Sequence, residues 1–360
     1  MSIQSQNEKT CSSVGTKPYS MLMRIRVFFS VYVLVCGVQL SGQVLAQGAL
    51  EQIKVFGPSL AGNLEGDDPE REVYVYLPHG YTRATNKRYP VIYFLHGYAV
   101  GAEIYVNGVL HLPDSADQAI AAGAGEMIVV LPDAFTLYGG SMYSNSPTIG
   151  DWETFISHDL VAYIDAHYRT IPARESRGLS GHSMGGYGTM RIGMKHPEVF
   201  GALYAMSSCC LLNQAPEQEA VETQIARMAK GLESSERSFV NALESQAAAW
   251  APNPQNPPYY FDWPYLDGEA QPVVQDKWTA NSALVFVDQY VPALKQYNAI
   301  MLDVGDKDRL AATNTQLDAA LTRLGVEHGW EVYDGEHGNR VGQRFVEKLL
   351  PFFTEHLISE

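Results

Sequence analysis

The sequence predicts an α/β protein with a mostly parallel central sheet and helices on both faces of that sheet. Several short, continuous apolar runs, such as 91–95 and 127–131, are typical of strands that are covered on both faces. Segments with helical spacing alternate with these runs, which is the pattern of a parallel α/β sheet. The composition, with 46% hydrophobic and 18% charged residues, is that of a globular protein with one large core or two smaller ones.

The expected elements follow one another along the chain. Strands are expected at 73–77, 91–95, 127–131, 179–180, 202–206, 299–304 and 330–333. Helices are expected at 152–167, 186–195, 313–324 and 341–357, with Asp151 as the N-cap of the first. Because the active sites of such sheets lie beyond the carboxyl ends of the strands, the residues that follow each strand are the first candidates for function.

Residues 1–46 have the pattern of an N-terminal extension that contains a signal peptide. A basic stretch precedes an apolar stretch at 27–38, and small residues then lead to Ala46. Because the apolar stretch is too short to span a bilayer comfortably, no stable membrane span is expected. We expect cleavage after Ala46, a secreted or periplasmic protein, and one folded domain at 47–360. A membrane anchor is the alternative interpretation of the same residues.

Charge and motif content exclude several classes of function. The formal net charge is −15, and lysine and arginine do not cluster, so the phosphate contacts of a nucleic-acid-binding protein are not expected. The sequence contains neither a pair of CxxC motifs nor HExxH, so neither a dedicated metal site nor a cofactor is expected.

Cys209 and Cys210 are adjacent and follow the strand expected at 202–206. Neighbouring Cα atoms are about 3.8 Å apart, which is closer than relaxed disulfides prefer. Two buried thiols are therefore favoured over a vicinal disulfide, although an oxidising compartment would permit the disulfide.

Residues Gly181-His-Ser-Met-Gly185 form a G-x-S-x-G motif. By itself this motif is weak, because a chain with 31 glycines contains some matches by chance. Here a short buried strand leads into it and a potential helix follows, which is the context of a nucleophile elbow. In such an elbow a tight turn exposes the serine hydroxyl, and the flanking glycines permit the turn. Ser183 is therefore the candidate nucleophile.

A serine nucleophile needs a base and an acid that orients the base. His337 is the candidate base, because it lies in a glycine-bounded loop between the last expected strand and the last helix. His328, which precedes that strand, is the alternative. Asp308 and Asp306 both follow the strand expected at 299–304, and Asp308 is preferred as the acid.

The oxyanion of an ester-cleaving serine enzyme is held by two backbone N–H groups. Met184, the residue after the nucleophile, is expected to supply one of them at the start of the helix. Tyr98 is expected to supply the other, because it follows the strand at 91–95 and the preceding Gly97 lets the chain turn close to the site.

At several of these positions the chain resembles the esterase family of α/β-hydrolases that includes S-formylglutathione hydrolases, feruloyl esterases, enterochelin esterases and mycolyltransferases. The matching stretches are 71–78, 89–97, 130–133, 152–155 and 177–187. The resemblance implies the α/β-hydrolase fold. It also implies that the family's triad roles belong to Ser183, Asp308 and His337, and its oxyanion roles to Tyr98 and Met184. Residues 338–341 depart from the family, many members of which carry a tryptophan-rich stretch after the histidine.

Residues 214–267 interrupt the alternation of strands and helices. The first part is polar and helical in character, and the second part, from Trp250, is rich in proline and aromatic residues. Long insertions on the ligand side of a sheet can cover a site, so we expect a cap at 211–280. A surface excursion that packs on its own aromatic residues is the alternative.

These observations together predict a secreted serine carboxylester hydrolase that acts through an acyl-enzyme on Ser183. The expected substrate is a small-molecule or carbohydrate-linked ester, with aryl or cinnamoyl esters of polysaccharides first. One alternative is an acyltransferase of the mycolyltransferase type, in which an alcohol replaces water as the acceptor. Another is a catalytically silent relative that binds a ligand, because fold does not fix function. The expected export argues against the cytosolic S-formylglutathione reaction.

Overall fold

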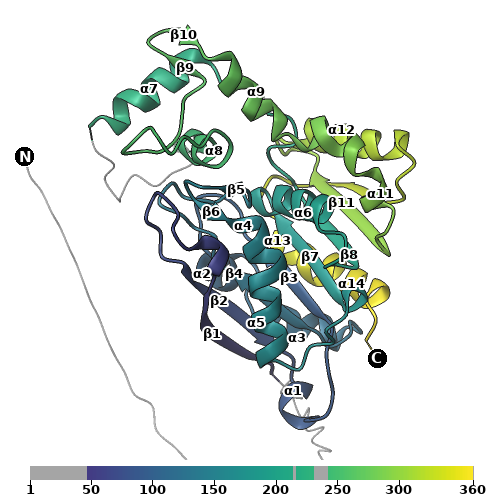
Figure 1. Ribbon diagram of the computed structural model, residues 1–360. Helices are drawn as coiled ribbons and strands as arrows, with labels where there is room; N and C mark the ends of the chain where they lie inside the picture. The colour runs from purple at the N-terminus through teal and green to yellow at the C-terminus, as the bar shows by residue number, and fades with distance from the viewer. Residues whose placement is uncertain (1–46, 214–215, 231–241, 360) are drawn as a thin grey trace, which may run out of the picture. The chain divides into compact units, whose positions relative to one another are not determined.

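The computed structural model describes residues 47–213, 216–230 and 242–359 (Figure 1). The expected signal peptide at 1–46 lies outside the described residues, so its cleavage after Ala46 stays a prediction. The strands are β1 (Ala49–Phe56), β2 (Glu70–Leu77), β3 (Val91–Leu95), β4 (Ile128–Pro132), β5 (Asn145–Ser146), β6 (Gly150–Asp151), β7 (Arg177–His182), β8 (Ala202–Met206), β9 (Tyr265–Leu266), β10 (Glu269–Ala270), β11 (Ala299–Gly305) and β12 (Gly329–Tyr333).

The helices include several short 3₁₀ and π turns. The α-helices are α1 (Gly80–Arg83), α2 (Ala102–Ile104), α3 (Asp114–Ala121), α4 (Trp152–Thr154), α5 (Leu160–His167), α6 (Met184–Lys195), α7 (Gln218–Met228), α8 (Ala242–Trp250), α9 (Pro272–Ala280), α10 (Ala283–Phe286), α11 (Val291–Leu294), α12 (Ala311–Arg323), α13 (Val341–Arg344) and α14 (Leu350–His356). The other turns are η1 (Pro58–Leu60), η2 (Tyr105–Val109), η3 (Phe155–Asp159), η4 (Arg174–Ser176), η7 (Val287–Tyr290) and η8 (Phe345–Leu349).

Eight strands form the central sheet in the order β1-β2-β4-β3-β7-β8-β11-β12. Six neighbouring strands in this order, β4, β3, β7, β8, β11 and β12, are parallel to one another. β2 is antiparallel to both β1 and β4. The predicted mostly parallel α/β sheet is therefore confirmed. β1 was not predicted, because it is an edge strand whose residues are mostly exposed and its sequence lacks a clear period-two pattern.

Both faces of the sheet are buried, as the continuous apolar runs predict. Alternate residues of a strand point to opposite faces, and in β3 Val91, Tyr93 and Leu95 belong to one core cluster. Ile92 and Phe94, from the same strand, belong to the cluster on the other face. The first cluster also holds residues of α5, α6 and α12, and the second holds residues of α3 and α14. Helices therefore cover the two faces, with β3 and β7 in the interior of the sheet (Figure 1).

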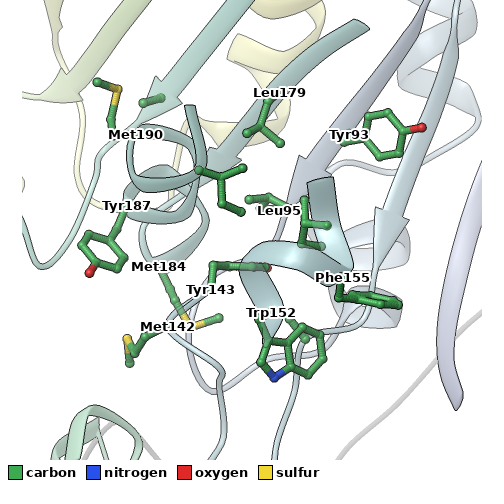
Figure 2. Packing of buried hydrophobic residues seen from close by; sticks show 14 of the residues in the cluster. Tyr93, Leu95, Met142, Tyr143, Trp152, Phe155, Leu179, Met184, Tyr187 and Met190 are labelled. Carbon is green, nitrogen blue, oxygen red and sulfur yellow. The ribbon is translucent and has the colours of Figure 1, made fainter. Parts of the chain in front are cut away.

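The first of these clusters reaches the segment that follows β7. Its labelled side chains in Figure 2 come from strands, helices and loops far apart in the sequence, namely Tyr93, Leu95, Met142, Tyr143, Trp152, Phe155, Leu179, Met184, Tyr187 and Met190. Met184 and Leu95, which flank the candidate site, are both fully buried. The floor of that site is therefore part of the packed core.

The two long predicted helices each contain a π turn. The helix predicted at 152–167 runs as α4, η3 and α5, and the one predicted at 341–357 runs as α13, η8 and α14. Asp151 caps the first of them as predicted, because its carboxylate accepts hydrogen bonds from Thr154 N at 3.0 Å and from Thr154 Oγ1 at 2.7 Å.

Residues between β8 and β11 contain α7, α8, α9 and the small β9–β10 hairpin, which lie near one another, and α8 lies beside β5 (Figure 1). Three side-chain hydrogen bonds join α8 to residues 140–146: Ser245 Oγ to Gly140 O at 2.6 Å, Ser146 Oγ to Ala248 O at 2.6 Å, and Trp250 Nε1 to Ser144 Oγ at 3.3 Å. The insertion is thus attached to the loop that precedes α4. That it caps the site remains a proposal.

Among the described residues, the helices are all too short or too polar to cross a membrane.

Candidate active site

Ser183 lies between β7 and α6, as the G-x-S-x-G motif predicts. Its backbone is strained, with φ 59° and ψ −112°, a conformation that non-glycine residues rarely adopt. Gly185 is needed because a Cβ atom at this position would lie 1.9 Å from the Leu95 carbonyl oxygen of β3. This close approach of strand and helix presents the Ser183 side chain at the carboxyl end of the sheet.

The three predicted triad side chains form one hydrogen-bonded chain. His337 Nε2 lies 2.9 Å from Ser183 Oγ, and His337 Nδ1 lies 2.8 Å from Asp308 Oδ2. β11 and β12 are parallel neighbours, with Gly305 opposite Tyr333, so the loops that carry Asp308 and His337 begin side by side. The fold therefore brings together residues that are far apart in the sequence.

The two alternatives have other partners. Asp306 Oδ1 accepts a hydrogen bond from Gly335 N at 2.9 Å, which ties the two loops together. The ring of His328 is held by Val326 O at 2.8 Å and by Asp318 Oδ1 at 3.0 Å. In the part of the chain that the structure describes, neither Asp306 nor His328 forms a hydrogen bond with Ser183 or with His337, so the geometry favours Asp308 and His337.

The charge state of Asp308 fixes the tautomer of His337. Burial raises the pKa of the Asp308 carboxyl, but its hydrogen bonds to His337 and to the Leu310 N–H outweigh this and hold the pKa below its usual value. The ionised carboxylate can only accept, so it takes the Nδ1–H of a neutral His337. Nε2 is then an acceptor and faces the Ser183 hydroxyl, which is the arrangement of a general base.

Both predicted oxyanion donors lie on segments that adjoin Ser183. Met184 is the first residue of α6, and the first N–H groups of a helix have no acceptor within it. A Cβ atom at Gly97 would lie 3.4 Å from Ser183 Cβ, so the loop after β3 runs directly beside the nucleophile. Tyr98 follows Gly97 in this loop, and its hydroxyl donates to Tyr138 O at 2.8 Å, which anchors the loop. This placement supports, but does not test, the oxyanion roles.

Two residues that the sequence did not single out hold the His337 loop. His182 Nε2 donates to the main-chain carbonyl oxygen of His337 at 2.7 Å, so Nδ1 is the acceptor for the Tyr105 hydroxyl, also at 2.7 Å. Burial, followed by the proximity of His337, lowers the pKa of His182 to about 3. A neutral His182 adds no positive charge beside the ring of His337.

The His182 pKa predicts an acid-dependent loss of stability. An unfolded histidine has a pKa near 6.5, so between about pH 6.5 and pH 3 the unfolded chain binds a proton that the folded chain does not. The free energy of unfolding should therefore fall as the pH falls through this window, by up to about 1.4 kcal/mol per pH unit for this group.

Urea unfolding between about pH 7 and pH 5 measures this slope, above the range in which unfolded carboxyl groups titrate. In the His182→Gln variant, the free energy of unfolding should depend less steeply on pH than in the wild type, because glutamine does not titrate. The difference between the two slopes is the contribution of His182. Equal slopes would contradict a neutral, buried His182.

His96 and Asp133 have structural roles in the loop after β3. His96 is fully buried, its Nδ1 donates to Gly97 O at 2.8 Å, and its Nε2 accepts from Ala134 N at 2.8 Å. Asp133 Oδ1 accepts from Phe135 N at 3.1 Å and so caps its own turn. These contacts stabilise the loops that follow β3 and β4.

Cys209 and Cys210 are free thiols, as favoured from their spacing, but they are half-buried rather than fully buried. The Cys209 N–H donates to the Ser183 carbonyl oxygen at 3.0 Å, so the segment after β8 supports the elbow. Gln246 of α8 reaches Cys210, with 3.8 Å between Nε2 and Sγ. The insertion and the loop beneath the nucleophile are therefore in contact.

The model of the family described as "Putative esterase" matches residues 68–353, which include all of these positions. The chain belongs to this family. An esterase of Mycobacterium tuberculosis is 34% identical over 130 residues, which cover 34% of this chain and 26% of that protein. An endo-1,4-beta-xylanase/feruloyl esterase of Xylanibacter ruminicola is 31% identical over 133 residues, which cover 35% of this chain and 18% of that protein. The alignments thus span about a quarter or less of these relatives.

The fold has a counterpart among solved structures. A ferulic acid esterase structure is 25% identical, with a TM-score of 0.62, over 87% of this chain and 99% of that one. The expected α/β-hydrolase fold and the resemblance to esterases are confirmed. These likenesses support a carboxylester hydrolase.

Proposed function

We propose that the protein is a serine carboxylester hydrolase. The observation that carries the proposal is the continuous hydrogen-bonded chain from Ser183 through His337 to the buried carboxylate of Asp308. This is the arrangement of nucleophile, general base and orienting acid that acyl transfer to a serine needs. The family assignment places the chain among proteins for which ester cleavage is the expected chemistry.

In the proposed reaction, Ser183 Oγ attacks the ester carbonyl carbon while His337 Nε2 takes the hydroxyl proton. The oxyanion of the tetrahedral intermediate accepts hydrogen bonds from the N–H groups of Met184 and Tyr98. His337 then returns the proton to the leaving alcohol as the carbon–oxygen bond breaks, which leaves an acyl-enzyme. Water, deprotonated by His337, attacks this ester, and the acid leaves with Ser183 restored.

We further propose an aryl or cinnamoyl ester as the substrate and an exported location for the enzyme. Two similar proteins support the substrate class. One is the ferulic acid esterase of known structure, and the other is the endo-1,4-beta-xylanase/feruloyl esterase of Xylanibacter ruminicola. The insertion, which contacts Cys210 beside the elbow through Gln246, is proposed as the cap that selects the acyl or alcohol group. The pattern at 1–46 supports export.

Two measurements on the full chain test this function. We expect hydrolysis of p-nitrophenyl esters from acetate to decanoate and of a ferulate ester. The dependence of the rate on acyl length would show how long an acyl chain the pocket accommodates. A fluorophosphonate probe should label one residue, identified by peptide mass spectrometry as Ser183. Failure of the probe to react, together with no turnover of any ester, would favour the catalytically silent relative.

A further inference from the structure

A cluster of metal-ligating side chains lies at the end of α6 opposite to Ser183. His158, on the π turn η3, meets His196 and Glu198, which follow α6, and one potential ligand atom from each lies within 4.8 Å of the others. It is the one group of three such residues found in the part of the chain that the structure describes. Because α6 has 12 residues and is about 18 Å long, the cluster is remote from the ester chemistry.

The geometry of the cluster approaches that of a tetrahedral zinc site. Two ligand atoms that are each about 2.0–2.1 Å from a tetrahedral zinc ion lie roughly 3.3 Å apart, and imidazoles that share the ion have ring centres roughly 5 Å apart. His196 Nδ1 and Glu198 Oε1 are 3.3 Å apart. The ring centres of His158 and His196 are 5.3 Å apart, with 78° between their planes. The three ligand atoms, which lie within 4.8 Å of one another, must therefore move closer together to share one ion.

The hydrogen bonds around His158 leave a nitrogen of this residue available. Ser157 Oγ donates its single hydrogen to Glu153 O at 2.7 Å, so it must accept from His158 Nδ1, which is also 2.7 Å away. The Nε2 atom of a neutral His158 is then unprotonated, which is the form that binds metal ions. A hydrogen bond to the other ring nitrogen is the usual support for a metal-binding histidine.

Charged side chains of both signs surround the cluster. Lys195 and Arg191 share the carboxylate of Glu153, and Arg174 Nε donates to Pro197 O at 2.5 Å, between two of the ligand residues. Among the described residues, the one ion-pair partner of Glu198 is His196. The Glu198 side chain is 61% exposed and that of His196 is 20% exposed, so an ion can enter from solvent and keep a water ligand.

We propose that His158, His196 and Glu198 form a surface site for a zinc ion. Two imidazoles, one carboxylate and a water molecule complete four-coordination. The ion ties the helical segment that contains η3 to the loop that follows α6, so its function is to stabilise the fold. No zinc motif in the sequence indicates this site, because its two histidines are separated by 37 residues, whereas such motifs have closely spaced ligands.

Zinc titration of the full chain, purified without a histidine tag and stripped with a chelator, tests the proposal. Calorimetry should find one more zinc ion bound per chain in the wild type than in His158→Gln or in Glu198→Gln. Ser157→Ala should keep the site but weaken it about 10–100-fold, because the ring loses its orienting partner. The melting temperature should rise with zinc for the wild type and not for the two ligand variants.

The matched control is His167→Gln, which removes an exposed histidine from α5 outside the cluster. This variant should keep the wild-type zinc stoichiometry, affinity and shift in melting temperature. If His158→Gln and Glu198→Gln bound zinc as the wild type does, or if His167→Gln lost as much binding as they do, the proposal would be wrong. Ester hydrolysis should be the same in all of these variants, because none of the substituted residues contacts the proposed active site.

Discussion

Replacing Asp308 by asparagine should lower kcat for ester hydrolysis by about 10⁴-fold. The carboxylate accepts the Nδ1–H of His337 at 2.8 Å, and this keeps Nε2 free to accept the Ser183 proton. An asparagine side chain can donate to Nδ1 instead, which would place the proton on Nε2 and turn the base toward Ser183 in the wrong tautomer. Ser183→Ala, which removes the nucleophile, should reduce kcat by about 10⁶-fold. Steady-state kinetics with p-nitrophenyl acetate measure both losses.

Asp306→Asn is the matched control, because it makes the same chemical change two residues away. Asp306 accepts one hydrogen bond from Gly335 N, and the amide oxygen of asparagine can also accept it. We therefore expect kcat to stay within a few-fold of the wild-type value. A larger loss in Asp306→Asn than in Asp308→Asn would reverse the assignment of the acid.

The location of the site could be predicted from the sequence because each of its parts follows a recognisable strand. The apolar run at 91–95 predicts β3, and the short buried segment before Ser183 predicts β7. In a parallel sheet, the carboxyl ends of both strands lie at the same edge. The loops that carry Tyr98 and Ser183 must then lie at the same edge. The sheet thus converts local apolar patterns into contacts between distant residues.

The strand pattern does not distinguish Asp308, the preferred acid, from Asp306. Both lie in the same loop, and their spacing does not say which carboxylate turns inward. The outcome depends on the loop that follows β12, where Gly335 N engages Asp306 and His337 Nδ1 engages Asp308. Two parallel strands fix where these loops begin, but the individual hydrogen bonds fix the partners.

His182 and Tyr105 were missed for a related reason. Within the elbow motif, His182 occupies a position whose residue type the turn itself does not dictate. Its role depends on two hydrogen bonds. The π turn η2 brings the Tyr105 hydroxyl to Nδ1 of His182, and the main-chain carbonyl oxygen of His337 accepts a hydrogen bond from Nε2. Every residue type has a main-chain carbonyl group, so a hydrogen bond to this group does not restrict the type of the partner residue. No sequence pattern could therefore have indicated the contact.

Gly185→Ala should strongly destabilise this fold. The added Cβ would lie 1.9 Å from the Leu95 carbonyl oxygen and 2.5 Å from the Leu95 carbonyl carbon. These atoms belong to the last residue of β3, which pairs with Gly181 of β7, so the backbone cannot move away without disturbing this pairing beside Ser183. We expect the free energy of unfolding to fall by about 4 kcal/mol or more, at the extreme of single-site effects. The midpoint of urea unfolding and the yield of soluble protein measure this loss.

Gly108→Ala separates this steric effect from the general effect of removing a glycine. Gly108 lies in the helical turn η2, and a Cβ atom there would meet nothing within 4 Å. Because alanine is the better helix former, this variant should equal the wild type or gain up to about 1 kcal/mol. If Gly185→Ala were as stable as Gly108→Ala, the tight contact between β3 and α6 could not be what holds Ser183 in its strained conformation. The nucleophile would then need another support, which within the described residues would come from the hydrogen bonds of the Ser183 backbone with Met206, Tyr187 and Cys209.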